Sequence, residues 1–176
     1  MSVENAPIES VPAAVEDAPA AAEDTRPNVV FTVGSVLRGD DAAGPALAKR
    51  LEDEPIEGWT VVDGGQTPED DLGYLRRLKP RRLLLVDAAA MGHEPGEIRL
   101  VTADDVATQF LITTHTLPIT FLLGELEGIC EDVTFLGIQP ATTEFFDPLS
   151  APVRRAVDEI YDCLAAGADF ARYHPA

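Results

Sequence analysis

Residues 34–45 read Gly-Ser-Val-Leu-Arg-Gly-Asp-Asp-Ala-Ala-Gly-Pro, and this stretch decides the fold class. It follows the apolar run 29–33, and the apolar residues after it recur at helical spacing, which predicts a helix over 41–52. A strand, a turn and a helix in this order are typical of an open α/β fold, in which ligands lie at the carboxyl ends of the strands. The turn therefore brings two carboxylates, Asp40 and Asp41, to that edge.

Strands and helices alternate along the rest of the chain. Apolar runs predict further strands at 59–62, 82–87, 97–101 and 132–136. Helical patterns predict helices at 67–79, 103–110, 116–126 and 150–164. The run 82–87 is almost wholly apolar, as in strands buried on both faces, whereas 97–101 alternates like an edge strand with one face in water. We therefore predict a three-layer α/β/α fold with a mostly parallel, twisted sheet of about five strands and helices on both faces.

The chain divides into one domain and two flanking segments. Residues 1–27 are rich in Ala, Pro and Glu, a composition that buries too little apolar surface to order a chain, so we expect a disordered acidic tail. Residues 28–168 form the single α/β domain. We expect residues 169–176 to be a frayed end with a solvated His174.

The bulk composition limits the classes of partner. The formal net charge of the 176 residues is −18, which disfavours nucleic acid and anionic membrane surfaces, because both need a basic footprint. The two cysteines, Cys130 and Cys163, make neither a disulfide framework nor a metal-binding spacing. The start of the chain lacks the pattern of a signal peptide, and no apolar run reaches membrane-spanning length. We expect a cytoplasmic monomer.

Three strand ends deliver carboxylates to the same edge of the sheet. Asp41, Asp63 and Asp87 follow the first three strands, and His115 enters from a loop before a helix. An Asp, Asp, His set suits a divalent metal, since it offers hard oxygens and one borderline nitrogen. Any one of these acids could instead hold a turn or cap a helix. For Asp40 we favour that structural role, as the N-cap of the helix after it.

Several familiar catalytic motifs are missing from the sequence. The first strand is not followed by a phosphate-binding Gly-Lys-Ser/Thr or by the full dinucleotide spacing. The chain has no Gly-x-Ser-x-Gly elbow, and neither cysteine has the local setting of a catalytic thiol. A covalent Ser or Cys intermediate is therefore not expected.

The chain resembles the hydrogenase maturation endopeptidases, most closely those that serve a formate-hydrogenlyase-type large subunit. The matching pieces occur in family order between about residues 28 and 165 and form a specific set, although no single one is decisive. They are Gly34-Ser35, Arg38 to Pro45, Val62 to Gly65 with Pro68-Glu69, Leu84 to Ala88, Met91-Gly92, Pro95 to Arg99, Thr113 to His115, and Phe135 to Pro140.

This resemblance implies removal of a short C-terminal peptide from the precursor of a nickel–iron hydrogenase large subunit, after nickel insertion. The bound nickel would serve as the recognition signal. The positions that match the family's nickel-contacting residues are Asp41, Asp87 and His115. We expect catalytic roles for Asp41 and, less directly, Asp63. We expect substrate contacts from residues that border these positions, namely Gly39, Asp40, Gly64, Gly65 and Thr114.

The mechanism and the reaction class have alternatives at this stage. A metal could polarise the scissile carbonyl or a water molecule, or nickel could only position the tail while a carboxylate acts as general base. Asp63 could orient water or only hold its turn. A non-catalytic nickel checkpoint would bind the same subunit without cutting it. A metal-dependent hydrolase of a small molecule would instead need a closed, apolar pocket.

Overall fold

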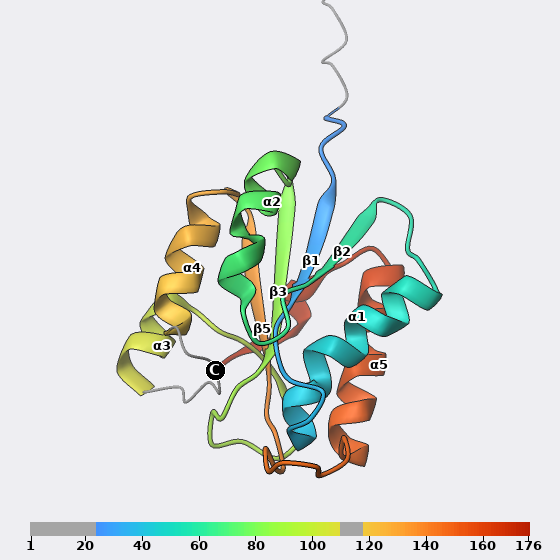
Figure 1. The fold of residues 1–176 in the computed structure, drawn as a ribbon, viewed down its shortest axis with the longest axis vertical. Coiled ribbons are helices and arrows are strands. Elements are labelled where there is room, and N and C mark those ends of the chain that lie inside the picture. The colour runs from blue at the N-terminus through green and yellow to red at the C-terminus, as the bar shows by residue number, and fades with distance from the viewer. Residues whose placement is uncertain (1–23, 110–117) are drawn as a thin grey trace, which may run out of the picture.

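The apolar runs of the sequence form the centre of a three-layer α/β/α fold in the computed structural model, which describes residues 24–109 and 118–176 (Figure 1). Within those residues one six-stranded sheet has the order β2-β1-β3-β5-β4-β6. Its strands are β1 (Asn28–Thr32), β2 (Trp59–Asp63), β3 (Arg82–Ala88), β4 (Ile98–Leu100), β5 (Val133–Ile138) and β6 (His174–Pro175). β2, β1, β3 and β5 are parallel, and β4 runs antiparallel to β5. The predicted fold class is confirmed.

Helices cover both faces of this sheet, as predicted (Figure 1). One face packs against α1 (Ala43–Asp53) and α5 (Ala151–Ala165). The other packs against α2 (Leu72–Leu78), α3 (Ala103–Gln109) and α4 (Ile119–Glu127). In the described part of the chain, every helix is too short or too polar to cross a bilayer.

The central strand β3 is buried on both faces. Leu83 and Leu85 belong to the core under α2 and α4, whereas Leu84 and Val86 belong to the core under α1 and α5. Side chains alternate along a strand, so a strand between two helical layers must be apolar at nearly every position. The almost unbroken apolar run therefore correctly predicted burial on both faces.

The C-terminal residues correct two predictions. A short 3-10 helix, η3 (Phe170–Arg172), is followed by β6, which pairs with β4, so the frayed end predicted for 169–176 is wrong. Phe170 and Tyr173 are buried, and the Phe170 ring meets the ring of Trp59 edge-on at a centroid distance of 6.2 Å. The pairing also covers β4, which is therefore not the edge strand. His174 itself is exposed, as expected.

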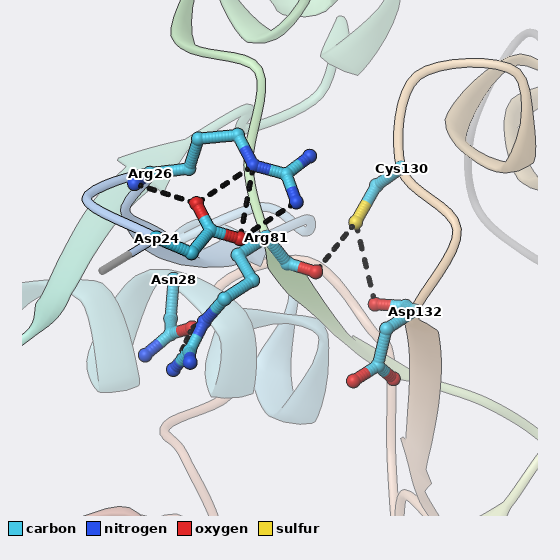
Figure 2. Close-up of polar contacts among 6 residues, drawn as sticks. All are labelled: Asp24, Arg26, Asn28, Arg81, Cys130 and Asp132. Atoms are coloured by element: carbon cyan, nitrogen blue, oxygen red, sulfur yellow. Dashed lines mark hydrogen bonds and ion pairs between the residues drawn. The ribbon is translucent and has the colours of Figure 1, made fainter. Parts of the chain in front are cut away.

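The first described residues lie at the amino ends of the strands. Of the predicted tail, residues 1–23 lie outside the described residues, whereas the Pro27 carbonyl accepts a hydrogen bond of 2.9 Å from the Arg81 amide. Figure 2 shows this edge, where Arg26 pairs with Asp24 at 2.7 Å. The Arg26 guanidinium lowers the pKa of Asp24 to about 2. Pro27, the last residue of the predicted tail, is therefore bonded to the domain.

Candidate functional site

Two of the predicted metal ligands are buried at the carboxyl edge of the parallel strands. Asp41 lies in the 3-10 helix η1 (Gly39–Ala42), which precedes α1 and packs against β3. Asp87 is the sixth residue of β3. Their exposed fractions are 1% and 0%. Carboxylates are almost never buried to this degree without a structural or functional reason, because burial removes their hydration. The structure therefore gives both acids the setting of a site.

Asp40, the neighbour of Asp41, has a different role from the one predicted. Its buried carboxylate accepts hydrogen bonds from the amides of Ala141, at 2.8 Å, and Ser150, at 2.7 Å, and from the Ser150 hydroxyl at 2.9 Å. It also accepts a longer bond of 3.4 Å from the Thr142 amide. The predicted N-cap is wrong, because both carboxylate oxygens hold residues that follow β5. These bonds engage both carboxylate oxygens, so we assign Asp40 a positioning role, and its predicted contact with the substrate stays a prediction.

Asp63 and the two glycines after it form the turn at the end of β2. One Asp63 oxygen accepts hydrogen bonds of 3.1 Å from the Gly65 amide and from the Thr32 hydroxyl. Gly65 has φ of +52°, which glycine adopts without the steric cost of a side chain. Gly64 packs against the Phe31 ring. These contacts favour the turn-holding alternative for Asp63.

Asp63 and Asp87 also leave the sheet on different faces. Thr32 of β1 is in register with Asp63 on one side and with Val86 on the other. Asp87 is one residue further along β3, and side chains alternate between faces along a strand. Asp63 is exposed, whereas Asp87 is buried. The structure thus separates Asp63 from Asp87.

Gly39 fixes the path of the chain into η1. It has φ of +51°, and a Cβ atom there would lie 2.7 Å from the Thr142 carbonyl oxygen. The Asp40 amide donates to the same oxygen at 2.8 Å. Only glycine permits both the left-handed backbone and this close approach. Gly39 therefore seats η1, and with it Asp41, against the loop that follows β5.

The described donors fit a divalent cation only in part. Asp41 and Asp87 supply hard oxygen ligands, and a cation between two buried carboxylates would offset their mutual repulsion. Across residues 24–109 and 118–176, however, no three His, Cys, Asp or Glu side chains form a metal-binding group. The predicted third ligand, His115, and the predicted substrate contact, Thr114, lie outside the described residues. Two carboxylates leave coordination positions for ligands from elsewhere.

Gln139 is a site residue that the sequence analysis did not single out. It follows β5, and its Oε1 accepts hydrogen bonds from the amides of Met91, at 2.7 Å, and His93, at 3.2 Å. Its backbone amide donates to the Glu97 carbonyl at 2.9 Å. Gln139 thereby fastens the loop that follows Asp87. Its signals in the sequence were its place at a strand end, directly before a proline, and its position within the family-like segment from Phe135 to Pro140.

We expect Gln139→Ala to lower catalytic turnover about 10-fold, because residues that orient ligands from outside typically contribute this much. The loop around Met91 should also become more susceptible to limited proteolysis. Gln139→Glu keeps an oxygen acceptor for the two amides but loses the Nε2 donor to the Pro140 carbonyl, at 3.2 Å, so it should recover only part of the activity. Steady-state kinetics of all three proteins, with limited proteolysis, test this. Full activity in Gln139→Ala would contradict the positioning role.

A cavity of about 550 Å³ lies at the opposite edge, where Asp24 to Asn28, Gly58 to Thr60 and Arg81 line it. Parallel strands point their carboxyl ends away from this edge, so the cavity is separate from the buried carboxylates. The Cys130 thiol is also here, 3.5 Å from the Arg81 carbonyl oxygen (Figure 2). Burial raises the pKa of Cys130, which disfavours the reactive thiolate. The position of Cys130 and its raised pKa both agree with the prediction that Cys130 is not a catalytic thiol.

The sequence matches a known protein family over most of the sheet. The family model described as hydrogenase maturation protease matches residues 44–166. The chain is 44% identical over 137 residues to the hydrogenase 3 maturation protease of Escherichia coli strain K12, covering 78% of this chain and 88% of the relative.

Solved structures give the same result. The solution structure of an endopeptidase from Escherichia coli superposes with a TM-score of 0.78 at 40% identity, covering 85% of this chain and 96% of the other. A hydrogenase maturation protease from Thermococcus kodakarensis has a TM-score of 0.71 at 24% identity, covering 81% of this chain and 92% of the other. At 24% identity, the Thermococcus kodakarensis structure supports the fold alone. At 40% identity, the Escherichia coli structure also supports the family resemblance found in the sequence.

Proposed function

Because the chain belongs to the hydrogenase maturation protease family, and is thus an endopeptidase, we propose that it removes a C-terminal peptide from the nickel-loaded precursor of a nickel–iron hydrogenase large subunit. One observation supports the site of this reaction. Asp41 and Asp87, two carboxylates from elements that pack against each other, are each buried at the carboxyl edge of the sheet. Neither lies in the opposite-edge cavity.

In this proposal nickel belongs to the substrate. Asp41 and Asp87, with His115, contact the nickel that the precursor already holds, and the precursor supplies the remaining ligands. The enzyme supplies only some of the nickel ligands, so its own affinity for nickel is low until the precursor contributes the others. This shared coordination would make the enzyme select the nickel-loaded precursor over the nickel-free one. The metal then orients the C-terminal segment along the edge.

The chemistry is hydrolysis of one peptide bond. A water oxygen adds to the scissile carbonyl carbon, the carbon–nitrogen bond breaks, and the products are a new carboxylate and an amine. Asp41 is our candidate for the general base that takes the proton from water, because η1, which carries it, lies at the carboxyl edge of the sheet, where we place the substrate. Asp63 holds its turn and takes no direct part.

The test uses a purified large-subunit precursor in nickel-loaded and nickel-free forms. After incubation with this protein, intact mass measurement should show loss of a short C-terminal peptide from the loaded form alone. Cleavage of both forms would overturn nickel recognition. Binding of the loaded form without cleavage would instead support the checkpoint alternative, and neither binding nor cleavage would overturn the proposed substrate.

A further inference from the structure

Four large apolar side chains are exposed in two loops at the carboxyl edge of the sheet. Val36 and Leu37 follow β1 and are 71% and 51% exposed. Phe145 and Phe146 lie between β5 and α5 and are 58% and 82% exposed. We call these four residues the apolar rim. Exposed apolar residues that gather in one place, rather than singly, mark an interaction surface.

The two loops of the apolar rim are held together. The Phe146 amide donates a hydrogen bond of 2.8 Å to the Leu37 carbonyl. The guanidinium carbon of Arg38 lies 4.5 Å from the centroid of the Phe145 ring, and its Nε donates to the Thr143 carbonyl at 3.3 Å. The rim is therefore a preformed surface, which reduces the entropy lost when a partner binds.

Phe146 lies in a turn, closed by a hydrogen bond of 3.4 Å from the Asp147 amide to the Glu144 carbonyl, and its backbone conformation is unusual. Its φ is +66°, a left-handed conformation that bulky residues rarely adopt. The other two non-glycine residues with positive φ in the described chain are Lys79, at the end of α2, and Ala168, just beyond α5, where such conformations commonly end helices. Phe146 ends no helix, and strain of this kind collects at sites of function.

The apolar rim is continuous with the buried carboxylates. Leu37 precedes the segment from Arg38 to Asp41, and the Asp40 side chain holds the start of the loop that carries the two phenylalanines. This loop, in orange, lies beside the start of α1 at the lower edge of Figure 1. A polypeptide whose end reaches Asp41 would therefore pass over or beside the rim.

The negative net charge of the chain favours a positively charged partner at the apolar rim. A second copy of the chain would bring another net charge of −18 against the first, and an anionic membrane would be repelled in the same way. The exposed acids Glu144 and Asp147 flank the two phenylalanines. The surface thus suits an apolar segment with positive charges beside it.

We propose that the apolar rim docks a segment of the large-subunit precursor that has large apolar side chains flanked by basic residues. This inference rests on the proposed function and specifies which surface of the enzyme holds the substrate beyond the carboxylates. Docking here adds binding energy away from the scissile bond. It should therefore affect substrate affinity more than the chemical step.

The experiment compares Phe146→Asn and the double variant Phe145→Ala/Phe146→Asn with the unsubstituted protein. Asn tolerates positive φ, so Phe146→Asn removes the ring while relieving the backbone, and its melting temperature should be unchanged or higher. With nickel-loaded precursor, KM of the double variant should rise about 10-fold or more, as for a binding hot spot, while kcat changes little. The matched control is Tyr74→Ala, which removes an aromatic side chain 41% exposed on α2 and should leave KM unchanged.

The outcomes separate the docking surface from the proposed function. An unchanged KM in the double variant, with cleavage intact, would overturn the docking surface and leave the function standing. An equal rise for Tyr74→Ala would also overturn it, because the effect would not be specific to the rim. If the unsubstituted protein neither binds nor cuts the loaded precursor, the proposed function is wrong. The precursor is then also wrong as the partner of the apolar rim. Raising the salt concentration should weaken binding if basic flanks contribute.

Discussion

Asp41→Asn should abolish processing of the nickel-loaded precursor while the protein remains folded. Asn has the size of Asp but no charge, so it keeps the shape of η1 and loses the anionic ligand and the candidate base. A metal contact of this kind is worth several kcal/mol in the transition state, so the rate should fall by about 10²–10³-fold or more. Asp87→Asn should have a loss of the same order, because Asp87 is equally buried in β3.

Single-turnover cleavage followed by mass measurement gives the rate, and the thermal midpoint confirms the fold. The matched control is Asp63→Asn, whose amide oxygen can still accept from Gly65 and Thr32. That variant should retain activity within about threefold, as expected for a residue outside the reacting groups. If Asp41→Asn cleaved at the normal rate, or Asp63→Asn cleaved slowly, the assignment of the reaction to Asp41 and Asp87 would be wrong. The turn after β2 would then be the better candidate.

The sequence predicted the parts of the fold that depend on local pattern. The apolar run of β3 showed that this strand is buried on both faces. The strand-end acids predicted the edge at which Asp41 and Asp87 are buried. The position of Asp41 and Asp87 at one edge could be predicted without coordinates because parallel strands must align their carboxyl ends, whereas their shared role stays a prediction. Local periodicity and the rules of sheet topology were sufficient for both conclusions.

The parts that could not be predicted depend on contacts distant in sequence. β6 has two residues, one of them a proline, and nothing in that pattern indicates pairing with β4. The Phe-Phe pair at 145–146 is apolar by composition, yet both rings are exposed because the loop is held by Leu37 and Arg38, more than a hundred residues away. A positive φ at a phenylalanine has no signal in the sequence.

Asp40→Ala should destabilise the protein by about 3 kcal/mol, since hydrogen bonds to a buried charge are worth about 1.5–3 kcal/mol each and water that enters offsets part of the loss. The side chain is 0% exposed and accepts from Ala141, Thr142 and Ser150. Urea denaturation should show a lower midpoint with an unchanged slope. The matched control is Asp162→Ala, whose side chain is 76% exposed and should change stability by about 0.5 kcal/mol or less.

This measurement also separates the two roles considered for Asp40. Loss of a helix N-cap costs about 1 kcal/mol and would leave the loop after β5 in place. Loss of the observed hydrogen bonds should cost more and release that loop, raising KM through the displaced Phe145 and Phe146. Asp40→Asn is a finer test of these hydrogen bonds. Both carboxylate oxygens accept hydrogen bonds, so in either orientation the amide NH₂ group would face a donor, and this variant should also be destabilised. A cost of about 1 kcal/mol with unchanged KM would contradict the positioning role of Asp40. A larger cost with raised KM would show that this buried carboxylate supports both the fold and the docking surface.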